Sequence, residues 1–317
     1  MNKVVAALNC LLIGGGGFIG SHLIPKLVAS GRSVTVLDRT GASSRFESDR
    51  VRYLTGDFGD AGLIRRLVAG HDEVVHLAYA TVPNTSFDNP LGDLDQNLHP
   101  AVQLFDIVAR KGARLLLVSS GGTVYGEAVS TPITEDHPTR PISPYGVTKL
   151  TLERYAYLYA VTRGLKVMCV RPANPYGEGQ RPFAGQGFVS TAMASAMQGK
   201  AITIFGEHGT VRDYIHVDDL AEGMLVVLDS GAPMETYNIG SSIGLSNLDV
   251  VNKMTPLLQA IDVEVRVDYA PSRPFDVKVN VLDCRLLQSL GWQPNVGIEE
   301  GLRRTRDWLV ENDVVSR

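Results

Sequence analysis

The sequence has few cysteines, little excess charge and no long apolar run, and each shortage excludes a class of protein. Cys10, Cys169 and Cys284 are scattered and odd in number, so neither a disulfide framework nor a cysteine metal site is expected, and no other metal site is indicated. A net charge of -4 over 317 residues gives no reason to expect nucleic acid or an anionic membrane as a partner. No segment reaches the roughly 20 apolar residues of a membrane span. We therefore expect a globular protein of the reducing cytoplasm.

The sequence does contain a regular alternation of short apolar runs with longer helical patterns. Apolar runs bounded by turn residues predict buried strands, and apolar residues three to four apart predict helices. Strands that alternate with helices form right-handed crossovers, so the pattern predicts an α/β fold with a Rossmann-type doubly wound parallel sheet. Strands are expected at 11–13, 34–37, 51–54, 73–77, 115–119 and 165–170, and helices at 19–30, 97–111 and 145–163.

A glycine-rich turn joins the first expected strand to the first expected helix. Gly14, Gly17 and Gly20 have no Cβ, so backbone N–H groups can approach a pyrophosphate at the helix N-terminus. Asp38 ends the next strand, where a carboxylate accepts hydrogen bonds from ribose hydroxyls and repels a 2′-phosphate. Together these residues predict a dinucleotide site and favour NAD over NADP, although the neighbouring Arg39 leaves NADP open.

The regular alternation of expected strands and helices ends after residue 173. Residues 1–173 are expected to form the NAD-binding Rossmann domain, to which segments near 211–245 return. Residues 174–317 begin with a loop rich in glycine and proline and continue with mixed helix and strand patterns. This part predicts a smaller mixed α/β lobe that binds the substrate and is interleaved with the main sheet.

Tyr145 and Lys149 lie four residues apart on an expected helix and therefore share one face. A tyrosine with a pKa near 10 is a poor base at neutral pH. A lysine one turn away and the positive charge of NAD⁺ both favour the phenolate. The pair is therefore expected to take a proton from a sugar hydroxyl while hydride leaves the same carbon.

Several segments, in the same order along the chain, resemble the extended branch of the short-chain dehydrogenase/reductase superfamily, in particular its nucleotide-sugar epimerases and dehydratases. They are residues 14–20, 119–126, 143–149, 171–177, 212–219, 273–276 and 290–294. The resemblance covers essentially the whole chain. It implies NAD as the cofactor, a UDP-sugar as the substrate and a homodimer built on the helices 97–111 and 145–163.

The resemblance also implies a set of residues around the cofactor. Asp57 matches the position that contacts the adenine, although an Asx turn after a strand explains it equally well. Leu77 and Ala78 match the strand end beneath the cofactor. The full set is Gly14, Gly17, Phe18, Ile19, Gly20, Asp38, Asp57, Phe58, Leu77, Ala78, Ser119, Tyr145, Lys149 and Pro172.

The third member of the family's catalytic triad, a serine or threonine, is replaced here. When the Val-Tyr-Gly at 124–126 is aligned on the family pattern, Gly121 falls where the catalytic hydroxyl normally stands. Alternate residues of an extended chain share a side, so Thr123 and Ser119 are expected to point the same way as the missing hydroxyl. Thr123 is the first candidate substitute and Ser120 the second.

The same segment discriminates among reactions of the family. The family members that dehydrate the sugar carry Asp-Glu at the positions that correspond to Gly122 and Thr123. The members that decarboxylate a uronic acid carry Glu at the position that corresponds to Thr123. Neither position holds a carboxylate here. Of the reactions in the family, the segment therefore leaves epimerisation at C4 and simple ketoreduction as candidates.

The resemblance places a nucleotide-sugar site in the second half of the chain. It implies that Asn174 and Arg212 bind the substrate diphosphate, that Arg273 binds phosphate and that Asp276 binds the nucleotide's ribose; a planar arginine suits such bidentate contacts. Asn280 falls where the pocket carries either a bulky aromatic or a small residue. Its amide favours a 2-acetamido sugar there.

The favoured function is an NAD-dependent 4-epimerase of UDP-N-acetylglucosamine and UDP-N-acetylgalactosamine, of UDP-glucose and UDP-galactose, or of both pairs. Arg181 resembles a residue of UDP-glucuronate 4-epimerases, which keeps that substrate as an alternative, although it can equally be a loop residue in water. A nucleotide-sugar 4-ketoreductase is a further alternative. Gly121 motivates a third, a catalytically silent NAD(H)-binding protein, against which the retained Tyr145 and Lys149 argue.

Overall fold

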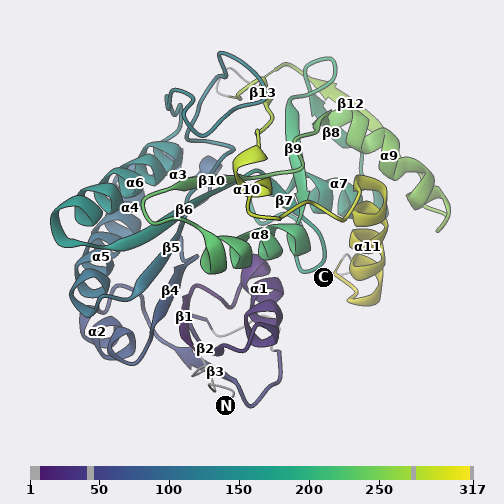
Figure 1. The fold of residues 1–317 in the computed structure, drawn as a ribbon. Helices are drawn as coiled ribbons and strands as arrows, with labels where there is room; N and C mark the ends of the chain where they lie inside the picture. The colour runs from purple at the N-terminus through teal and green to yellow at the C-terminus, as the bar shows by residue number, and fades with distance from the viewer. Residues whose placement is uncertain (1–7, 41–45, 273–275, 315–317) are drawn as a thin grey trace.

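The computed structural model describes residues 8–40, 46–272 and 276–314. Seven parallel strands form its main sheet, in the order β10-β6-β5-β4-β1-β2-β3 (Figure 1). The sheet confirms the predicted doubly wound architecture. Its strands are β1 (Asn9–Ile13), β2 (Ser33–Asp38), β3 (Val51–Thr55), β4 (Glu73–His76), β5 (Arg114–Val118), β6 (Lys166–Pro172) and β10 (Thr236–Ile239).

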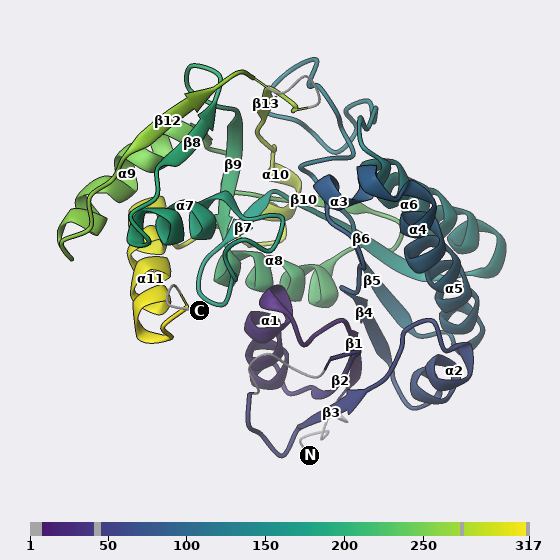
Figure 2. The same ribbon diagram turned by 180° about the vertical axis from the view of Figure 1, so that it is seen from behind.

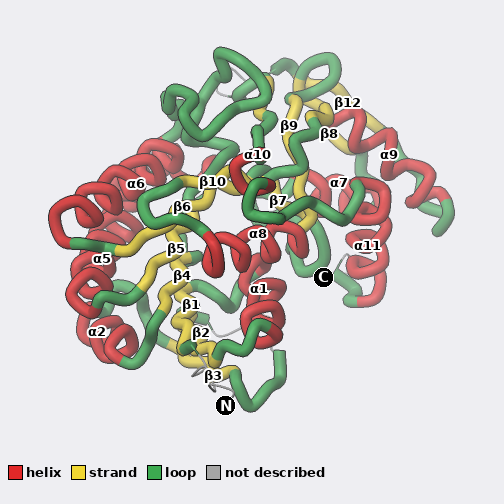
Figure 3. The backbone as a smooth tube through the Cα atoms, viewed as in Figure 1, coloured by secondary structure: helices red, strands yellow, loops and turns green. Residues whose placement is uncertain are grey.

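Helices cover both faces of this sheet, and each face has its own hydrophobic core. Alternation along β1 divides its side chains: Leu12 packs with the helices of one face, whereas Leu11 and Ile13 pack with those of the other. Figure 3 shows the strands as a central row between the two helical layers. The first face holds α1 (Phe18–Ala29) and α8 (Val217–Ser230), and the second holds α2 (Ala61–Ala69), α5 (His99–Lys111) and α6 (Pro144–Arg163).

The strand order reverses beside β1. The chain first runs outward from β1 through β2 to β3 and then returns to β4 on the other side of β1. In open α/β sheets, ligands bind at the carboxyl ends of the strands where this reversal occurs. The glycine turn between β1 and α1 lies at this point.

The helix α6, which carries Tyr145 and Lys149, begins and ends as its sequence predicts. The Ser143 hydroxyl accepts a hydrogen bond from the Gly146 N–H at 3.1 Å, and Pro144 occupies the first turn. Gly164, at a φ of 69°, ends the helix in the left-handed conformation. The helix expected at 97–111 is α5, which continues from two short elements, α4 (Pro90–Asp93) and η1 (Leu94–Leu98).

A smaller lobe with mixed strand directions lies beside the sheet and has a third hydrophobic core (Figure 2). The chain returns from this lobe to the main sheet through α8 and β10. None of the helices in the described ranges combines the length and apolar character needed to cross a membrane. The lobe contains β7 (Asn174–Tyr176), β8 (Ile202–Phe205), β9 (Val211–His216), β11 (Gly244–Ser246), β12 (Val267–Ala270), β13 (Val279–Asn280), α7 (Phe188–Met197), α9 (Asn247–Gln259) and α11 (Ile298–Glu311).

Candidate active site

The turn between β1 and α1 forms an open cradle. Gly14 has a φ of 80°, and a Cβ built there would lie 2.5 Å from the backbone of Ala78. A Cβ at Gly20 would lie 2.2 Å from the carbonyl oxygen of Gly15, which brings helix and turn together. A Cβ at Gly17, in contrast, would meet nothing within 4 Å. Backbone is thus exposed at the N-terminus of α1, in a geometry that fits a pyrophosphate.

The adenosine end of this cradle lies at the ends of β2 and β3. Asp38 lines a cavity there with Asp57, Phe58 and Ala78, and one of its oxygens accepts a hydrogen bond from the Gly16 N–H at 3.0 Å. Asp57 also accepts a hydrogen bond from the Gly59 N–H at 2.6 Å, so it makes the Asx turn and faces the cavity as well. The carboxylate of Asp38 and the cradle fit an NAD molecule.

Tyr145 and Lys149 line a second cavity that adjoins the cradle. The Lys149 ammonium group donates to the carbonyl oxygen of Val118 at 2.9 Å and lies 5.6 Å from the centre of the Tyr145 ring. Burial lowers the pKa of Lys149 to about 7. Burial, and after it the charge of Asp93, raises the pKa of the Tyr145 phenol, while a hydrogen bond with Ser120 partly offsets the increase.

The chain after β5 stays extended only as far as Gly121. The N–H groups of Ser119 and Gly121 both donate to carbonyl oxygens of β6, whereas those of Thr123 and Val124 both donate to the carbonyl oxygen of Ser120, so the backbone turns before Thr123. The expectation that Thr123 continues the alternation of Ser119 and Gly121 is therefore wrong. The Ser119 hydroxyl donates to Glu153, and Ser120 is the hydroxyl that lowers the pKa of Tyr145.

Gly121 does not leave a gap at the site. A Cβ at this position would lie 2.6 Å from a methyl group of Leu282 and 2.9 Å from the carbonyl oxygen of Pro172. A side chain there would point into packed atoms, so the idea of a missing hydroxyl at Gly121 is wrong. Thr123 does line the cavity, and its buried hydroxyl has no partner among the described residues.

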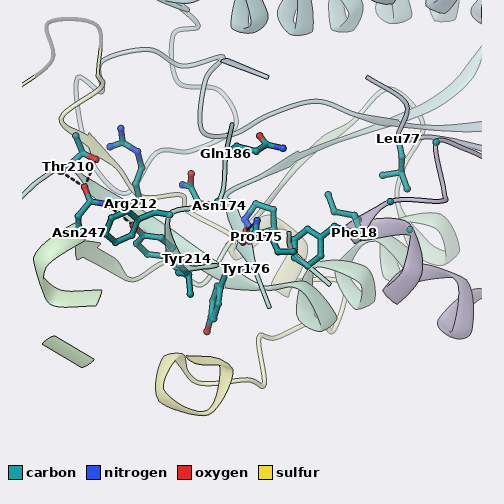
Figure 4. Close-up of a pocket in the computed structure, with 18 residues that line it drawn as sticks. Phe18, Leu77, Asn174, Pro175, Tyr176, Gln186, Thr210, Arg212, Tyr214 and Asn247 are labelled. Atoms are coloured by element: carbon teal, nitrogen blue, oxygen red, sulfur yellow. Dashed lines mark hydrogen bonds between the residues drawn. The ribbon is translucent and has the colours of Figure 1, made fainter. Parts of the chain in front are cut away.

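The same cavity is also lined by the guanidinium-bearing residue Arg212. Arg212 makes no ion pair with a carboxylate within the described ranges; its guanidinium donates to the carbonyl oxygen of Val211 at 3.0 Å. Burial lowers its pKa. Arg212, Asn174 and Leu77 also line the neighbouring pocket of Figure 4, where Arg212 and Asn174 lie on one side and Phe18 and Leu77 at the other end. A partly buried cation that forms no ion pair among the described residues suits an anionic ligand.

Two of the expected substrate residues, Asn280 and Arg181, lie away from the cavity. Asn280 is fully buried, and its amide donates to the carbonyl oxygen of Gly121 at 2.9 Å, so it supports the turn and forms no pocket wall. Arg181 is exposed and lines a separate hollow with His22 and Trp308. Arg273 lies outside the described residues, whereas Asp276 lines the cavity beside Arg212.

Sequence reasoning missed two residues next to the Tyr–Lys pair. The ring of Tyr79 lies 4.0 Å from the Lys149 ammonium group and 4.8 Å from the ring of Tyr145. Asp93 is completely buried near the same pair. The sequence holds only weak indications that these residues belong to the site. Tyr79 follows the end of β4, and Asp93 precedes Asn97 by one helical turn.

Comparisons with known proteins identify the family that the chain resembles. A model of the NAD dependent epimerase/dehydratase family matches residues 10–240. The UDP-glucose 4-epimerase of Mycolicibacterium smegmatis is 31% identical over 311 residues, which cover 95% of this chain and 98% of that protein.

Solved structures resemble the whole chain. The UDP-glucose 4-epimerase of Thermotoga maritima with UDP-glucose has a TM-score of 0.88 and 31% identity, with coverage of 96% of this chain and 99% of that one. The UDP-glucose 4-epimerase of Thermus thermophilus in complex with NAD has a TM-score of 0.86 and 32% identity, with the same coverage of 96% and 99%.

Proposed function

The chain belongs to the NAD dependent epimerase/dehydratase family, and from that premise we propose that it inverts C4 of a UDP-sugar through a transient 4-keto sugar. One observation carries the proposal: a single cavity is lined by Tyr145 and Lys149 and by Arg212. A proton carrier and a diphosphate anchor are thus within reach of one nucleotide sugar. The absence of a carboxylate at Gly122 and Thr123 favours epimerisation over dehydration or decarboxylation.

Tyr145 is the proposed carrier of the proton. When bound, NAD supplies reversible hydride acceptance from C4. The Tyr145 phenolate takes the proton of the C4 hydroxyl, and the phenol later returns it. Ser120 lowers the pKa of Tyr145. The Lys149 ammonium group, 5.6 Å from the centre of the Tyr145 ring, also favours the phenolate because it is a nearby positive charge. Because C4 is first oxidised and then reduced, the reaction has no net redox change.

Arg212 and Asn174 are the proposed anchor of the substrate diphosphate. Both residues line the cavity, and both come from strands of the smaller lobe, β9 and β7, which pair with each other. An anchor at the diphosphate leaves the hexose free to turn and present the other face of C4 to the same tyrosine. The pairing of the two strands holds Asn174 and Arg212 beside each other.

The walls of the sugar cavity favour a neutral hexose. They include Val82, Pro83, Phe87 and Ile142, which are apolar. Lys149 and Arg212 line the cavity but are already assigned to Tyr145 and to the diphosphate, so a uronic acid needs a further cation near its carboxylate. Arg181, the residue that suggested one, lies in a different hollow. Since Asn280 is buried, it gives no support for an acetamido sugar. We therefore place UDP-glucose and UDP-galactose first among the substrates and the N-acetylhexosamines second.

A panel of UDP-sugars tests the proposal. The protein is incubated with UDP-glucose, UDP-N-acetylglucosamine and UDP-glucuronate, and the configuration at C4 is read by NMR. We expect inversion of UDP-glucose without added NADH, and a loss of roughly 100-fold or more in Tyr145→Phe, which removes only the hydroxyl. Turnover that consumes NADH stoichiometrically indicates a ketoreductase instead, and conversion of UDP-glucuronate alone contradicts the neutral-hexose assignment.

We also propose that the protein is a homodimer that pairs through α5 and α6. The outer side of α6 exposes Tyr157, Leu158 and Val161, whose relative exposures are 57%, 48% and 59%. Apolar side chains grouped on one helix are typical of a surface that another protein covers. Sedimentation should give a dimer for the native protein and a monomer after Val161→Glu, and a native monomer contradicts the proposal.

A further inference from the structure

A buried carboxylate lies directly behind the wall of the sugar cavity. Asp93, the last residue of α4, has a relative exposure of 0%. Both of its oxygens are occupied: one accepts hydrogen bonds from the Thr81 hydroxyl and the Asn97 amide, and the other from the Thr148 hydroxyl. Three donors from three different segments thus hold this carboxyl group in one place. No cation forms a salt bridge with Asp93 in the part of the chain that the structure describes.

The partners of Asp93 connect it to the hydride-transfer site. Thr148 immediately precedes Lys149 on α6, and Thr81 lines the same cavity as Tyr145. The negative charge of Asp93 raises the pKa of both Tyr145 and Lys149. It therefore acts on both members of the pair in the same direction.

Other ionisable groups near the pair are compensated or neutral. Glu153 also faces Lys149, but its carboxylate forms an ion pair with Arg171 at 2.6 Å. Burial keeps the thiol of Cys169 protonated by raising its pKa well above the usual value. Burial lowers the pKa of His76 to about 3, so that ring is neutral at ordinary pH.

Tyr79, which stacks on Lys149, completes the set of groups that face the pair. Burial raises the pKa of its phenol, so Tyr79 is uncharged as well. Asp93 is thus the negative charge near Tyr145 and Lys149 that has no positive partner of its own within the described residues.

We propose that Asp93 is a positioning residue whose fixed negative charge holds Lys149 protonated and Tyr145 as a phenol, so that the phenolate forms only beside the positive charge of bound NAD⁺. The inference rests on the proposed function in so far as Tyr145 carries the proton. In that case Asp93 couples the protonation of Tyr145 to the charge state of the cofactor. The phenol is then already protonated when the keto sugar must be reduced.

Asp93→Asn tests this role because it removes the charge and nearly preserves the shape. The NAD⁺-loaded protein is titrated by the ultraviolet absorbance of tyrosinate, with the same variant carrying Tyr145→Phe subtracted. We expect the midpoint of Tyr145 to fall by about one pH unit or more, the usual effect of one nearby charge. The two midpoints of the pH–rate profile should move to lower pH as well, since the pKa of Lys149 falls together with that of Tyr145.

Asp95→Asn is the matched control. Asp95 lies two residues away and is exposed, so the same change of charge should leave the midpoint and both limbs in place. A merely structural role of Asp93 would lower the rate without moving any midpoint, and that result overturns the proposal. Equal shifts in the two variants overturn it as well.

Asp93→Ser covers the case in which Asp93→Asn does not fold. This variant also removes the charge and keeps a small polar side chain, so the Tyr145 midpoint must fall here as well; an unchanged midpoint contradicts the proposal. The tyrosinate titration needs no substrate. If no nucleotide sugar is turned over, the proposed function fails, while the titration still decides the role of Asp93.

Discussion

Ser120→Ala is the substitution that best tests how the site activates its base. Ser120 is the hydroxyl that lowers the pKa of Tyr145, whereas the hydroxyl of Thr123 has no hydrogen-bond partner among the described residues. A hydrogen bond to the phenol oxygen favours the phenolate, so its loss disfavours the base form. Thr123→Val is the matched variant, because it also removes one hydroxyl from the same cavity.

The expected size follows from the strength of a hydrogen bond to a charged group, about 1.5–3 kcal/mol. Since one pKa unit corresponds to about 1.4 kcal/mol, Ser120→Ala should raise the pKa of Tyr145 by about one to two units. Below that pKa the phenolate population, and with it kcat, should fall by about 10- to 150-fold. The acidic limb of the pH–rate profile should therefore move to higher pH, in the direction of the raised pKa.

The assay is C4 inversion of a UDP-sugar measured over a range of pH, with NAD content and Tm as controls for folding. Thr123→Val should change KM if its hydroxyl contacts the sugar, but it should leave the acidic limb in place. The reasoning is refuted if Thr123→Val moves the limb while Ser120→Ala does not. A drop in kcat for Ser120→Ala with no movement of the limb also contradicts it.

Three further substitutions test other parts of the site. Asp38→Ala should weaken NAD binding by about 10- to 150-fold in calorimetry through loss of a charge-assisted hydrogen bond, and equal affinity of the native protein for NADP contradicts the assignment. Arg212→Ala should weaken UDP binding by at least about tenfold, with Arg212→Lys intermediate because lysine lacks the planar fork; unchanged affinity excludes Arg212 as the anchor. Gly121→Ser should lower the free energy of unfolding by about 1–3 kcal/mol through overpacking against Leu282, and a stable variant with faster turnover contradicts the packing seen here.

The fold was predictable because its signals are local. Strands of a parallel sheet buried on both faces are continuous apolar runs, and helices carry apolar residues every three to four positions. The predicted strands 11–13 and 34–37 fall within β1 and β2, and the predicted helix 145–163 within α6. The predicted family and its cofactor are confirmed by the comparisons, because turn and helix motifs keep their spacing along the chain.

The hydroxyl that acts on Tyr145 was not predictable in the same way. Alternation holds only while the chain stays extended, and the backbone turns after Gly121, before Thr123. The turn that follows is held by the carbonyl oxygen of Ser120 and by Asn280, a residue 159 positions away from Gly121. No local pattern carries information about such a contact.

By itself the sequence determined the doubly wound sheet, the glycine cradle followed by Asp38, and the Tyr145–Lys149 pair on one helical face. Each depends on residues a few positions apart, whose relation is set by the geometry of a helix, a strand or a turn. Only the tertiary structure decided that Ser120 contacts Tyr145, that Asn280 is buried while Arg181 is exposed, and that Asp93 lies behind the site. These outcomes depend on which distant segments pack together, and burial and charge at a position follow from that packing.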